Sequence, residues 1–300
     1  MKKALTSVRK NGISIIFKYM FLKHVYRLKP IVSPILFESI NMYLRLGYWP
    51  NLKKPRTLNE KIVYQKLFTK KALFTIVADK YKVRDYVANK VGESILNEIY
   101  FVGNDAKKVN FDILPNKFVI KANHGSGWNF IVKDKSSINQ QNIIDKCNSW
   151  LKQKYSINSN GYETHYDNIQ PLVLFEKYLY GISEIPFLDY KFFCFRGIVK
   201  FIAVDTEKEK TPNRNIYDTN WNNIEFSWPD FPKKKSISKP SQLAEMVKIA
   251  EVLSKEFEFC RIDLYLSTDG IKFGEITLTP GSGWDKISPQ AWDRRLGDFW

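Results

Sequence analysis

The residues of this chain best suited to chemistry are two carboxylates near its end, each on a run of alternating polar and apolar residues. Asp263 follows Arg261 by two positions on the first run, and Phe273, Glu275 and Thr277 alternate on the second. A period of two is typical of β-strands, so the alternating residues of each run are expected to share one face. A hairpin formed by the two runs would bring the carboxylates together as ligands for a divalent cation.

The turn between the two runs decides which residues lie opposite each other. We expect a three-residue loop at 268–270, because its last residue is a glycine, which tolerates the left-handed conformation of such loops. This loop pairs Ser267 with Ile271 and places Asp263 opposite Glu275. Facing like charges destabilise a sheet, and a bound cation would remove the repulsion. The alternative is a solvated sheet face on which a neighbouring arginine neutralises the two acids.

A glycine loop earlier in the chain offers groups that bind phosphate. Lys121 ends a predicted strand and precedes the loop Gly125-Ser126-Gly127. Backbone N–H groups of glycines can approach phosphate oxygens closely, and the lysine adds a positive charge beside them. A single glycine loop is a weak signal, and an ordinary hairpin turn gives the same pattern.

Lys80 and Glu176 complete the set of candidate residues. Lys80 stands at the start of a predicted helix, where on its own it is an ordinary solvated lysine. Glu176 and Lys177 end an apolar run that begins at Leu172. Such a strand end can offer backbone groups to an adenine and a carboxylate to ribose hydroxyls. The alternative is a buried strand that ends in a capping acid.

Helix caps and the periodicity of apolar residues predict the helices and strands that position these residues. Thr57 and Glu60 have the spacing of a helix capping box. Further helices are expected at 81–91, 140–154 and 243–253. Strands are expected at 118–122, 129–133, 172–179 and 189–205, the last with a turn at Arg196-Gly197. Irregular segments are expected at 156–168 and 212–235.

The order of the chemical segments is more specific than any one of them, and it resembles the order in ATP-grasp enzymes. Arg261-Ile-Asp263 followed by Glu275-Ile-Thr277 is similar to the metal motif of D-alanine–D-alanine ligases. Four segments resemble the TupA-like ATP-grasp family: Asn59-Glu60-Lys61, Asp79-Lys80-Tyr81, Lys121-Ala-Asn-His-Gly-Ser-Gly and Gly274-Glu-Ile-Thr-Leu-Thr-Pro-Gly-Ser-Gly. The resemblance covers roughly Thr57 to Trp300.

The resemblance implies an α+β fold of the ATP-grasp type, in which two α+β subdomains hold ATP between them. The residues implied to bind the nucleotide are Lys80, Lys121, Gly125, Ser126, Gly127, Glu176, Lys177 and Tyr178. The ligands implied for Mg²⁺ are Asp263, Glu275 and Thr277, and the catalytic residues are Arg261 and Lys191. Many ATP-grasp enzymes have asparagine where Thr277 stands, but a hydroxyl oxygen also suits Mg²⁺.

Four regions are expected along the chain. They are a basic helical segment at 1–56, a helical or α+β region at 57–115, a lid subdomain with the glycine loop at 116–180, and a C-terminal subdomain with the metal hairpin at 181–300. Residues 1–37 contain eight Lys or Arg and no acid. An amphipathic helix on an anionic membrane surface fits this segment, and so does a basic helix packed on the protein with its lysines in water.

Composition narrows the classes of protein to which this chain could belong. Three scattered cysteines and three distant histidines argue against a disulfide framework and a zinc site, and favour the cytoplasm. The net charge of +16 favours acidic partners. The family resemblance implies a ligase of cell-surface polysaccharide biosynthesis that uses ATP and Mg²⁺ to join an amine, such as an amino acid, to a glycan or uronic-acid carboxylate. The basic N-terminus would keep this ligase near the inner face of the cell membrane. The alternatives are a metal-dependent glycosyltransferase and, less favoured because no binding motif is present, a nucleic-acid-binding protein.

Overall fold

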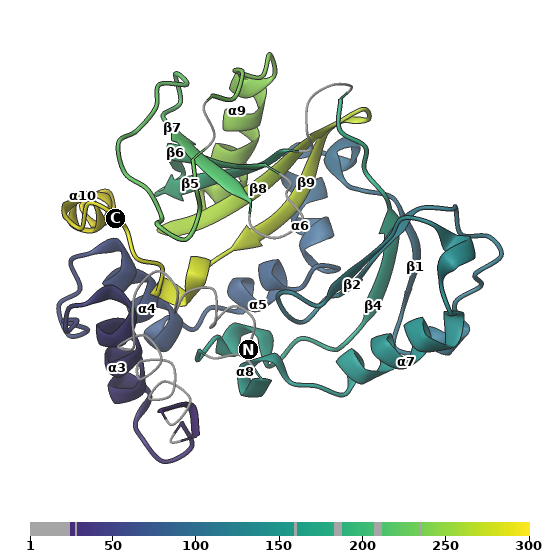
Figure 1. The fold of residues 1–300 in the computed structure, drawn as a ribbon, viewed down its shortest axis with the longest axis horizontal. Coiled ribbons are helices and arrows are strands. Elements are labelled where there is room, and N and C mark those ends of the chain that lie inside the picture. Colours follow the sequence, from purple (N-terminus) through teal and green to yellow (C-terminus); the bar gives the residue numbers. More distant parts are fainter. Residues whose placement is uncertain (1–24, 28, 159–160, 183–187, 207–211, 234–235) are drawn as a thin grey trace, which may run out of the picture.

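The computed structural model describes residues 25–27, 29–158, 161–182, 188–206, 212–233 and 236–300. Within these ranges the strands form two antiparallel sheets, each with helices against it, so the predicted α+β class is confirmed (Figure 1). The α-helices are α3 (Pro34–Leu46), α4 (Leu58–Phe68), α5 (Ala72–Ala78), α6 (Val83–Val91), α7 (Gln140–Leu151), α8 (Tyr155–Asn158), α9 (Leu243–Ser254) and α10 (Ala291–Gly297). The 3₁₀ turns are η1 (Glu93–Ile95), η2 (Ala106–Lys108), η3 (Lys135–Ser137), η4 (Thr164–Tyr166) and η5 (Pro280–Gly283).

The larger sheet has five strands in the order β7-β6-β5-β8-β9. These strands are β5 (Leu188–Phe195), β6 (Ile198–Thr206), β7 (Asn213–Tyr217), β8 (Phe259–Ser267) and β9 (Gly270–Thr277). As predicted, a tight turn at Arg196-Gly197, with φ of 50° and 77°, joins β5 to β6. The prediction of an irregular segment at 212–235 was wrong for its first residues, because β7 lies there as the edge strand.

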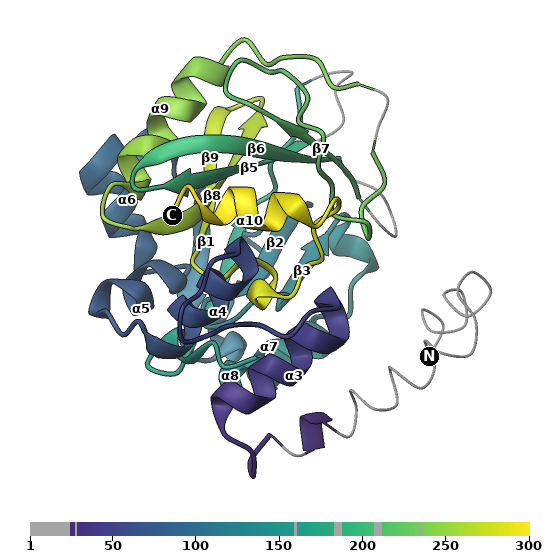
Figure 2. The same cartoon turned by 90° about the vertical axis from the view of Figure 1, so that its left-hand side faces the viewer.

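One face of this sheet is largely apolar, and the other is aromatic at one end of its strands and charged at the other. Residues from α5, α6 and α9 pack on the apolar face. On the opposite face, aromatic residues such as Phe195 and Phe259 pack with residues of α4 and α10. Figure 2 shows α10 lying across this sheet. Further along the same face the strands carry Lys191 and Asp263, which pair across β5 and β8. The helices therefore cover the aromatic half of this face, and its charged half remains for a site.

The smaller sheet has four strands in the order β1-β4-β2-β3. They are β1 (Ile99–Gly103), β2 (Phe118–Ala122), β3 (Asn129–Val132) and β4 (Val173–Lys177). α7 packs on one face, where Phe118 and Phe175 are buried with Trp150. Lys121 and Glu176 alternate with these core residues, so they lie on the face turned away from α7. The sheet takes β1 from the predicted region 57–115 and its other strands from the predicted lid.

The carboxylate hairpin has the predicted pairs at its site end but a different turn. Arg261 lies opposite Thr277, and Asp263 lies opposite Glu275, as predicted. The turn contains two residues and not three, because Ser267 pairs with Gly270, so the predicted pairing with Ile271 was wrong. A bulge beyond Asp263 adds one residue to β9 and restores the register before the carboxylates.

The extra residue of this bulge is Gly274, and it reverses the faces of β9. Phe273 is buried in the core with α9, whereas Glu275 lies on the charged face. The expected alternation of Phe273, Glu275 and Thr277 on one face was therefore wrong. A Cβ at position 274 would lie 2.9 Å from the backbone oxygen of Asp263 and 2.9 Å from the ring of Tyr265. Only glycine fits this approach of the two strands.

The first turn of α4 forms hydrogen bonds with the C-terminal segment, so the two ends of the region from Thr57 to Trp300 lie together. Thr57 and Glu60 form the predicted capping box. Asn59 donates hydrogen bonds from its side chain to Asp293 and to the backbone of Asp285, and the Lys61 ammonium donates to the backbone oxygens of Gly297 and Trp300. The Asn59-Glu60-Lys61 motif thus holds α4 against the C-terminal segment.

The N-terminal part of the described chain packs beside these elements. α3 is capped by Ser33 and contributes Phe37, Met42 and Leu46 to a small core that also contains Trp284. The predicted amphipathic helix on a membrane falls largely on residues 1–24, which lie outside the described residues. Within the described ranges, no helix has both the length and the apolar character needed to cross a membrane.

Candidate nucleotide and metal site

The predicted metal ligands and the predicted catalytic arginine form one hydrogen-bonded cluster. Arg261 donates from Nε and Nη2 to the two oxygens of Asp263, each at 2.6 Å. Its Nη2 also donates to Oε1 of Glu275 at 2.9 Å, and the hydroxyl of Thr277 donates to the same oxygen at 3.0 Å. The hairpin register places all four side chains on the charged face, which is what a site at this position requires.

Lys191 lies at the centre of a second group of contacts on β5. Its ammonium contacts Asp189 and lies 3.2 Å from Oδ2 of Asp263 and 3.9 Å from Oδ2 of Asp205. Asp205 is also bound by Arg214 through hydrogen bonds of 2.6 and 2.7 Å. Burial acts to lower the pKa of Lys191, but the carboxylates of Asp263 and Asp189 outweigh it and raise that pKa. Lys191 is therefore charged and binds the predicted metal ligand Asp263.

The oxygen donors of the hairpin fit Mg²⁺. Mg²⁺ is usually held by one or two carboxylates together with phosphate oxygens and water, and Asp263 and Glu275 supply two carboxylates beside the hydroxyl of Thr277. In the part of the chain that the structure describes, no group of three or more His, Cys, Asp or Glu side chains forms a metal cage. The donor set suits a metal held jointly with a nucleotide.

Lys80 is positioned by the residue before it. Asp79 is buried, and its Oδ1 accepts hydrogen bonds from the backbone N–H of Tyr81 at 2.8 Å and from the side-chain amide of Asn123 at 2.9 Å. The backbone N–H of Lys80 donates to the oxygen of Asn123, and its ammonium donates to the oxygen of Gly125 at 2.6 Å. The fold thus brings Lys80 to the glycine loop, although 45 residues separate the two partners in the sequence.

Electrostatic interactions connect Lys80 to the hairpin. Burial lowers the pKa of Lys80, and the nearby carboxylate of Glu275 opposes this effect. Burial alone would raise the pKa of Glu275, but the cations of Lys80, Arg261 and Lys191 lower it to about 2. Glu275 is therefore ionised at neutral pH and faces cations from both β5 and the α5–α6 turn.

Lys121 and Glu176 meet on the open face of the smaller sheet. The Lys121 ammonium lies 2.8 Å from Oε2 of Glu176, whose side chain is 7% exposed. The same oxygen accepts a long contact of 3.5 Å from the amide of Asn97. The two predicted nucleotide-binding side chains are thus neighbours, and Glu275 and Glu176 both act on the pKa of Lys80. The four groups belong to one electrostatic environment.

The other two predicted nucleotide-binding residues at the end of β4 point elsewhere. Lys177 forms an ion pair of 2.7 Å with Asp269 in the hairpin turn. The ring of Tyr178 lies 5.0 Å from that of Tyr180. In the predicted role the backbone of this segment, and not these side chains, would meet the adenine, so a contact of Lys177 with the nucleotide stays a prediction.

The glycine loop packs against aromatic residues. A Cβ at Gly125 would lie 2.7 Å from the ring of Tyr155 and 2.9 Å from the ring of Trp128. Ser126 and Gly127 are exposed beyond this contact, and Gly127 has a φ of 76°. The closed packing at Gly125 and the exposed tip at Ser126 and Gly127 suit a loop that covers a ligand.

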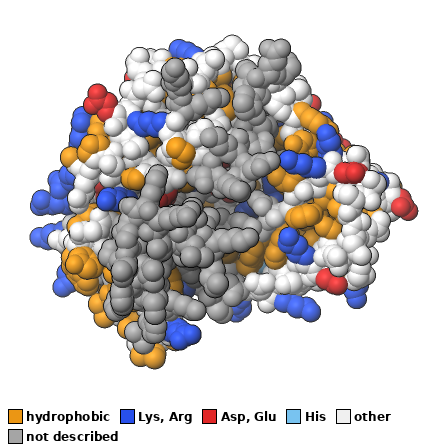
Figure 3. Space-filling view, in the orientation of Figure 1, with side chains coloured by type: hydrophobic (Ala, Val, Ile, Leu, Met, Phe, Trp, Pro, Cys, Tyr) orange, Lys and Arg blue, Asp and Glu red, His pale blue; other side chains and the backbone are white. Residues whose placement is uncertain are grey.

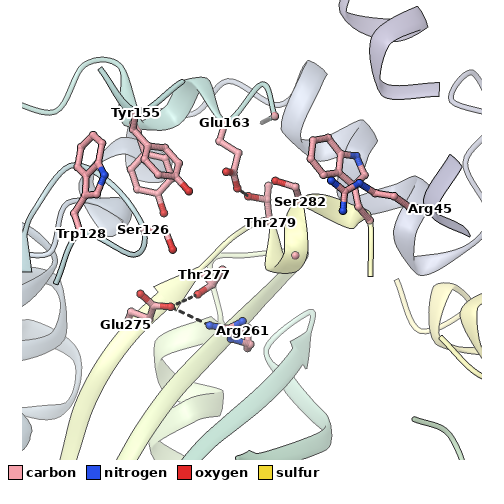
Figure 4. A pocket seen from close by; sticks show the side chains of 14 residues that line it. Arg45, Ser126, Trp128, Tyr155, Glu163, Arg261, Glu275, Thr277, Thr279 and Ser282 are labelled. Carbon is pink, nitrogen blue, oxygen red and sulfur yellow. Dashed lines mark hydrogen bonds and ion pairs between the residues drawn. The ribbon is translucent and has the colours of Figure 1, made fainter. Parts of the chain in front are cut away.

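A cavity of about 490 Å³ opens between the glycine loop and the hairpin (Figure 4). Ser126 reaches it from the loop, and Arg261, Glu275 and Thr277 reach it from the sheet. Four aromatic residues also line it, namely Trp128, Tyr155, Tyr166 and Trp284. Lys191 and Asp263 are buried and do not line this cavity, which Asp263 meets through its partner Arg261.

Several residues of this cavity were missed in the sequence. Tyr155, Glu163 and Tyr166 belong to or border the segment that was expected to be an irregular loop, yet part of it forms α8 and η4. Arg45 comes from α3, outside the resemblance. A cluster of aromatic residues with two acids within an otherwise polar stretch was the available signal, but it has no fixed spacing.

Glu163 is the buried acid of this cavity. It accepts a hydrogen bond of 2.6 Å from the hydroxyl of Thr279. Burial raises the pKa of Glu163, although the cation of Lys66 and the hydrogen bond from Thr279 oppose the change. Burial also raises the pKa of Tyr155, and the carboxylate of Glu163 adds to that effect.

Comparison with known proteins adds to this geometry. A family model described as TupA-like ATP-grasp matches residues 60–300. No curated protein matches the chain. Among solved structures, the ATP-grasp ligase PsnB complexed with a minimal precursor is similar at 12% identity and a TM-score of 0.40, covering 76% of this chain and 60% of that chain.

Two D-alanine–D-alanine ligases are also similar. The enzyme from Helicobacter pylori has 17% identity and a TM-score of 0.42, covering 75% of this chain and 61% of that chain. The enzyme from Bacillus anthracis complexed with ATP has 16% identity and a TM-score of 0.39, covering 69% and 55%. The chain therefore spans about 55 to 61% of the length of these three ligases.

Proposed function

Because the chain belongs to the TupA-like ATP-grasp family, we propose that it is an ATP-dependent ligase that joins a carboxylate to an amine through an acyl phosphate. The observation that carries the proposal is the convergence of Lys80, Lys121 and Arg261 with the carboxylates of Asp263 and Glu275. Two sheets and the α5–α6 turn supply these groups, and the pKa values of Lys80 and Glu275 respond to one another.

Each of these residues has a different proposed role in phosphoryl transfer. This reaction depends on positioning and charge neutralisation, because the protein forms no covalent bond with the phosphoryl group. Lys80 and Lys121 hold the phosphates, and Arg261 neutralises charge on the group in transfer. Asp263 and Glu275 hold Mg²⁺, which when bound neutralises further phosphate charge. Lys191 keeps Asp263 in place.

The glycine loop protects the product of that step. An acyl phosphate hydrolyses if water reaches it, so a cover over the cavity favours transfer to the amine. Ser126 and Gly127 form the exposed tip of the loop, and Lys80 anchors its base through the oxygen of Gly125. We assign the loop the role of a lid on this basis.

The acid substrate that we propose is a uronic acid or related glycan carboxylate, within cell-surface polysaccharide biosynthesis. The aromatic lining of the cavity, with Trp128 and Tyr155 at one end (Figure 4), supports a sugar because aromatic faces present large, rigid apolar surfaces with polar edges. The amine that we propose is an amino acid.

We also propose that the basic N-terminus keeps the enzyme close to the anionic inner face of the membrane, where lipid-linked glycans are built. Eight Lys or Arg and no acid occur in residues 1–37. Within its described part, Ile31, Ile35 and Leu36 are exposed apolar side chains. Elsewhere on the visible face, basic side chains are spread around the molecule and form no single stripe of the kind that tracks a nucleic acid (Figure 3).

Phosphate release tests the ligase proposal. The protein is incubated with ATP, Mg²⁺ and pairs of uronic acids and amino acids, and we expect release only when both substrates are present. A glycosyltransferase would instead bind a nucleotide sugar and tolerate Lys121→Ala, whereas the ligase loses ATP affinity with that change. Absence of phosphate release with every pair, together with no nucleotide binding, would rule out the ligase.

A further inference from the structure

Arg45 lines the cavity although it lies outside the residues that match the family. It is in the last turn of α3, and the family match begins at residue 60. Figure 4 shows Arg45 at the end of the cavity opposite Trp128 and Tyr155, with Glu163, Thr279 and Ser282 between them. The N-terminal segment thus supplies one wall of the site.

The guanidinium of Arg45 is held in a fixed place. Its Nη2 donates a 2.8 Å hydrogen bond to the hydroxyl of Tyr26, and its Cζ lies 4.9 Å from the centre of the Trp284 ring. Trp284 is itself fixed by a 2.8 Å hydrogen bond to Glu38, which forms a fully buried ion pair of 2.9 Å with Lys66. Arg45 therefore presents its charge from a rigid support.

Arg45 differs from the other cations of this region in its partners. Lys66 is paired with Glu38, and Arg261 is paired with both Asp263 and Glu275. Among the described residues no carboxylate forms an ion pair with Arg45, and its Nε is buried without a hydrogen-bond partner. Since Nε is enclosed by the protein, the donors left for a carboxylate in the cavity are those of Nη1 and Nη2.

We propose that Arg45 binds the carboxylate of the amine substrate, and that this substrate is therefore an α-amino acid. The inference rests on the proposed ligase function. The carboxylate that reacts must lie near Arg261 and Glu275, where the nucleotide phosphates are expected. Arg45 lies at another part of the cavity, so the anion that it holds is not the reacting one.

An amino acid also carries an ammonium group, and this end of the cavity has a carboxylate that can pair with it. Glu163 lies between Arg45 and Tyr155 in the view of Figure 4 and offers a carboxylate for the ammonium. The aromatic end, with Trp128 and Tyr155, is left for the sugar of the acid substrate. This arrangement directs the amine nitrogen into the cavity, toward the hairpin where the acyl phosphate forms. The ammonium gives a proton to Glu163, the neutral nitrogen attacks the acyl carbon, and phosphate leaves as the acyl C–O bond breaks.

Hydroxylamine separates the two halves of the reaction. It traps an acyl phosphate as a hydroxamate and carries no carboxylate, so Arg45 has nothing to bind. Wild type is incubated with ATP, Mg²⁺ and glucuronate or galacturonate, and with hydroxylamine or an amino acid as the amine. The amino acids are alanine, glutamate and lysine, each compared with its α-amide. Arg45→Gln, Arg45→Lys and Lys53→Gln are measured beside wild type, since Lys53 is exposed in the same N-terminal segment.

We expect Arg45→Gln to raise the KM for the amino acid by about tenfold or more, the factor that accompanies loss of one charge-assisted hydrogen bond. The ratio of amino-acid coupling to hydroxamate formation falls by the same factor. Wild type prefers each amino acid to its α-amide, and Arg45→Gln loses that preference. Arg45→Lys recovers part of it, and Lys53→Gln behaves as wild type.

Other outcomes separate the two proposals. If hydroxamate forms but Arg45→Gln keeps the preference for amino acids over their amides, Arg45 does not bind the amine and only this inference fails. A change confined to the KM for the uronic acid likewise overturns it, because the anion then belongs to the acid substrate. If wild type forms no hydroxamate with either acid and also binds no nucleotide, the ligase function itself fails, and the role of Arg45 fails with it.

Discussion

The guanidinium of Arg261 binds both carboxylate oxygens of Asp263, each at 2.6 Å, from two residues away on the same face of β8. The alternative of a neutralising arginine, which the sequence left open, therefore describes part of the site. Arg261 also reaches Glu275 at 2.9 Å and lines the cavity, so it neutralises both acids, and the metal site stays a proposal. The carboxylate of Asp263 retains lone pairs beyond these two hydrogen bonds, so it could hold a cation together with Arg261.

Asp263→Asn should remove nucleotide turnover and leave the fold intact. The amide has no charge to offer Mg²⁺ or Lys191, and loss of a group that stabilises transferring charge commonly costs about 100-fold or more in rate. Because Asp263 is a buried partner of two cations, we also expect a lower Tm. Phosphate release and thermal unfolding measure the two effects, with the exposed Asp112→Asn as control. Turnover within threefold of wild type would contradict the assignment.

Lys121→Gln should weaken ATP binding by about tenfold to 100-fold, since it removes the charge-assisted contact to phosphate. Glutamine keeps a donor for Glu176, so the buried carboxylate retains a hydrogen bond and the sheet remains folded. Lys133→Gln provides the matched control, because Lys133 is an exposed lysine just after β3 of the same sheet. Isothermal titration with a non-hydrolysable ATP analogue measures both. Equal affinities of the two variants would remove Lys121 from the nucleotide site.

Gly274→Ala should damage the site through the register of the hairpin. Its Cβ would meet the backbone oxygen of Asp263 at 2.9 Å, so the strands must move apart beside the carboxylates. Gly270→Ala is the control, because it strains the turn at a φ of 85° but meets no atom within 4 Å. We expect both variants to lose stability and only Gly274→Ala to lose ATP turnover by more than about tenfold. Similar turnover in the two variants would show that the bulge does not position the site.

His165 should make stability fall as the solution becomes acidic. Burial, with a smaller effect from the cation of Lys66, lowers the pKa of His165 to about 4 from 6.5. Between these values the unfolded chain binds a proton that the folded protein does not, so the free energy of unfolding decreases as pH falls through this range. The loss reaches about 3 kcal/mol at most. Urea unfolding from pH 7 to pH 4 measures it.

His165→Gln should flatten that dependence. Burial also lowers the pKa of His124, which contributes in the same direction, so the difference between wild type and variant isolates His165. A variant with the same slope of unfolding free energy against pH as wild type would mean that His165 titrates normally in the folded protein.

Local signals predicted the elements of the fold well. The capping box at Thr57 and Glu60 depends on residues three apart, and it appears as expected. Alternation predicted β2, β3 and β8, because the period of two reflects burial on one face. The predicted pairing of Asp263 with Glu275 is confirmed, although the hairpin differs from the predicted one in two ways that cancel. The turn was one residue shorter than expected and the bulge at Gly274 compensated for it, a cancellation that no local pattern reveals.

The cavity could be predicted only in part, because its residues come from distant segments. Arg261, Glu275 and Ser126 belong to motifs with recognisable spacing. Glu163 and Arg45 do not, and their roles depend on how α3, α8 and the segment after β9 pack together. Packing of that kind depends on contacts across more than 100 residues of sequence, such as that of Lys66 with Ser282.

The position of α3 has a consequence for how such enzymes diversify. The groups proposed to handle ATP all lie within residues 60–300, while one wall of the cavity comes from residues 34–46. Exchange of that helix between family members would alter which amine enters and leave the nucleotide chemistry in place. The residues proposed to bind ATP and Arg45, proposed to bind the amine, thus lie on separate stretches of one chain.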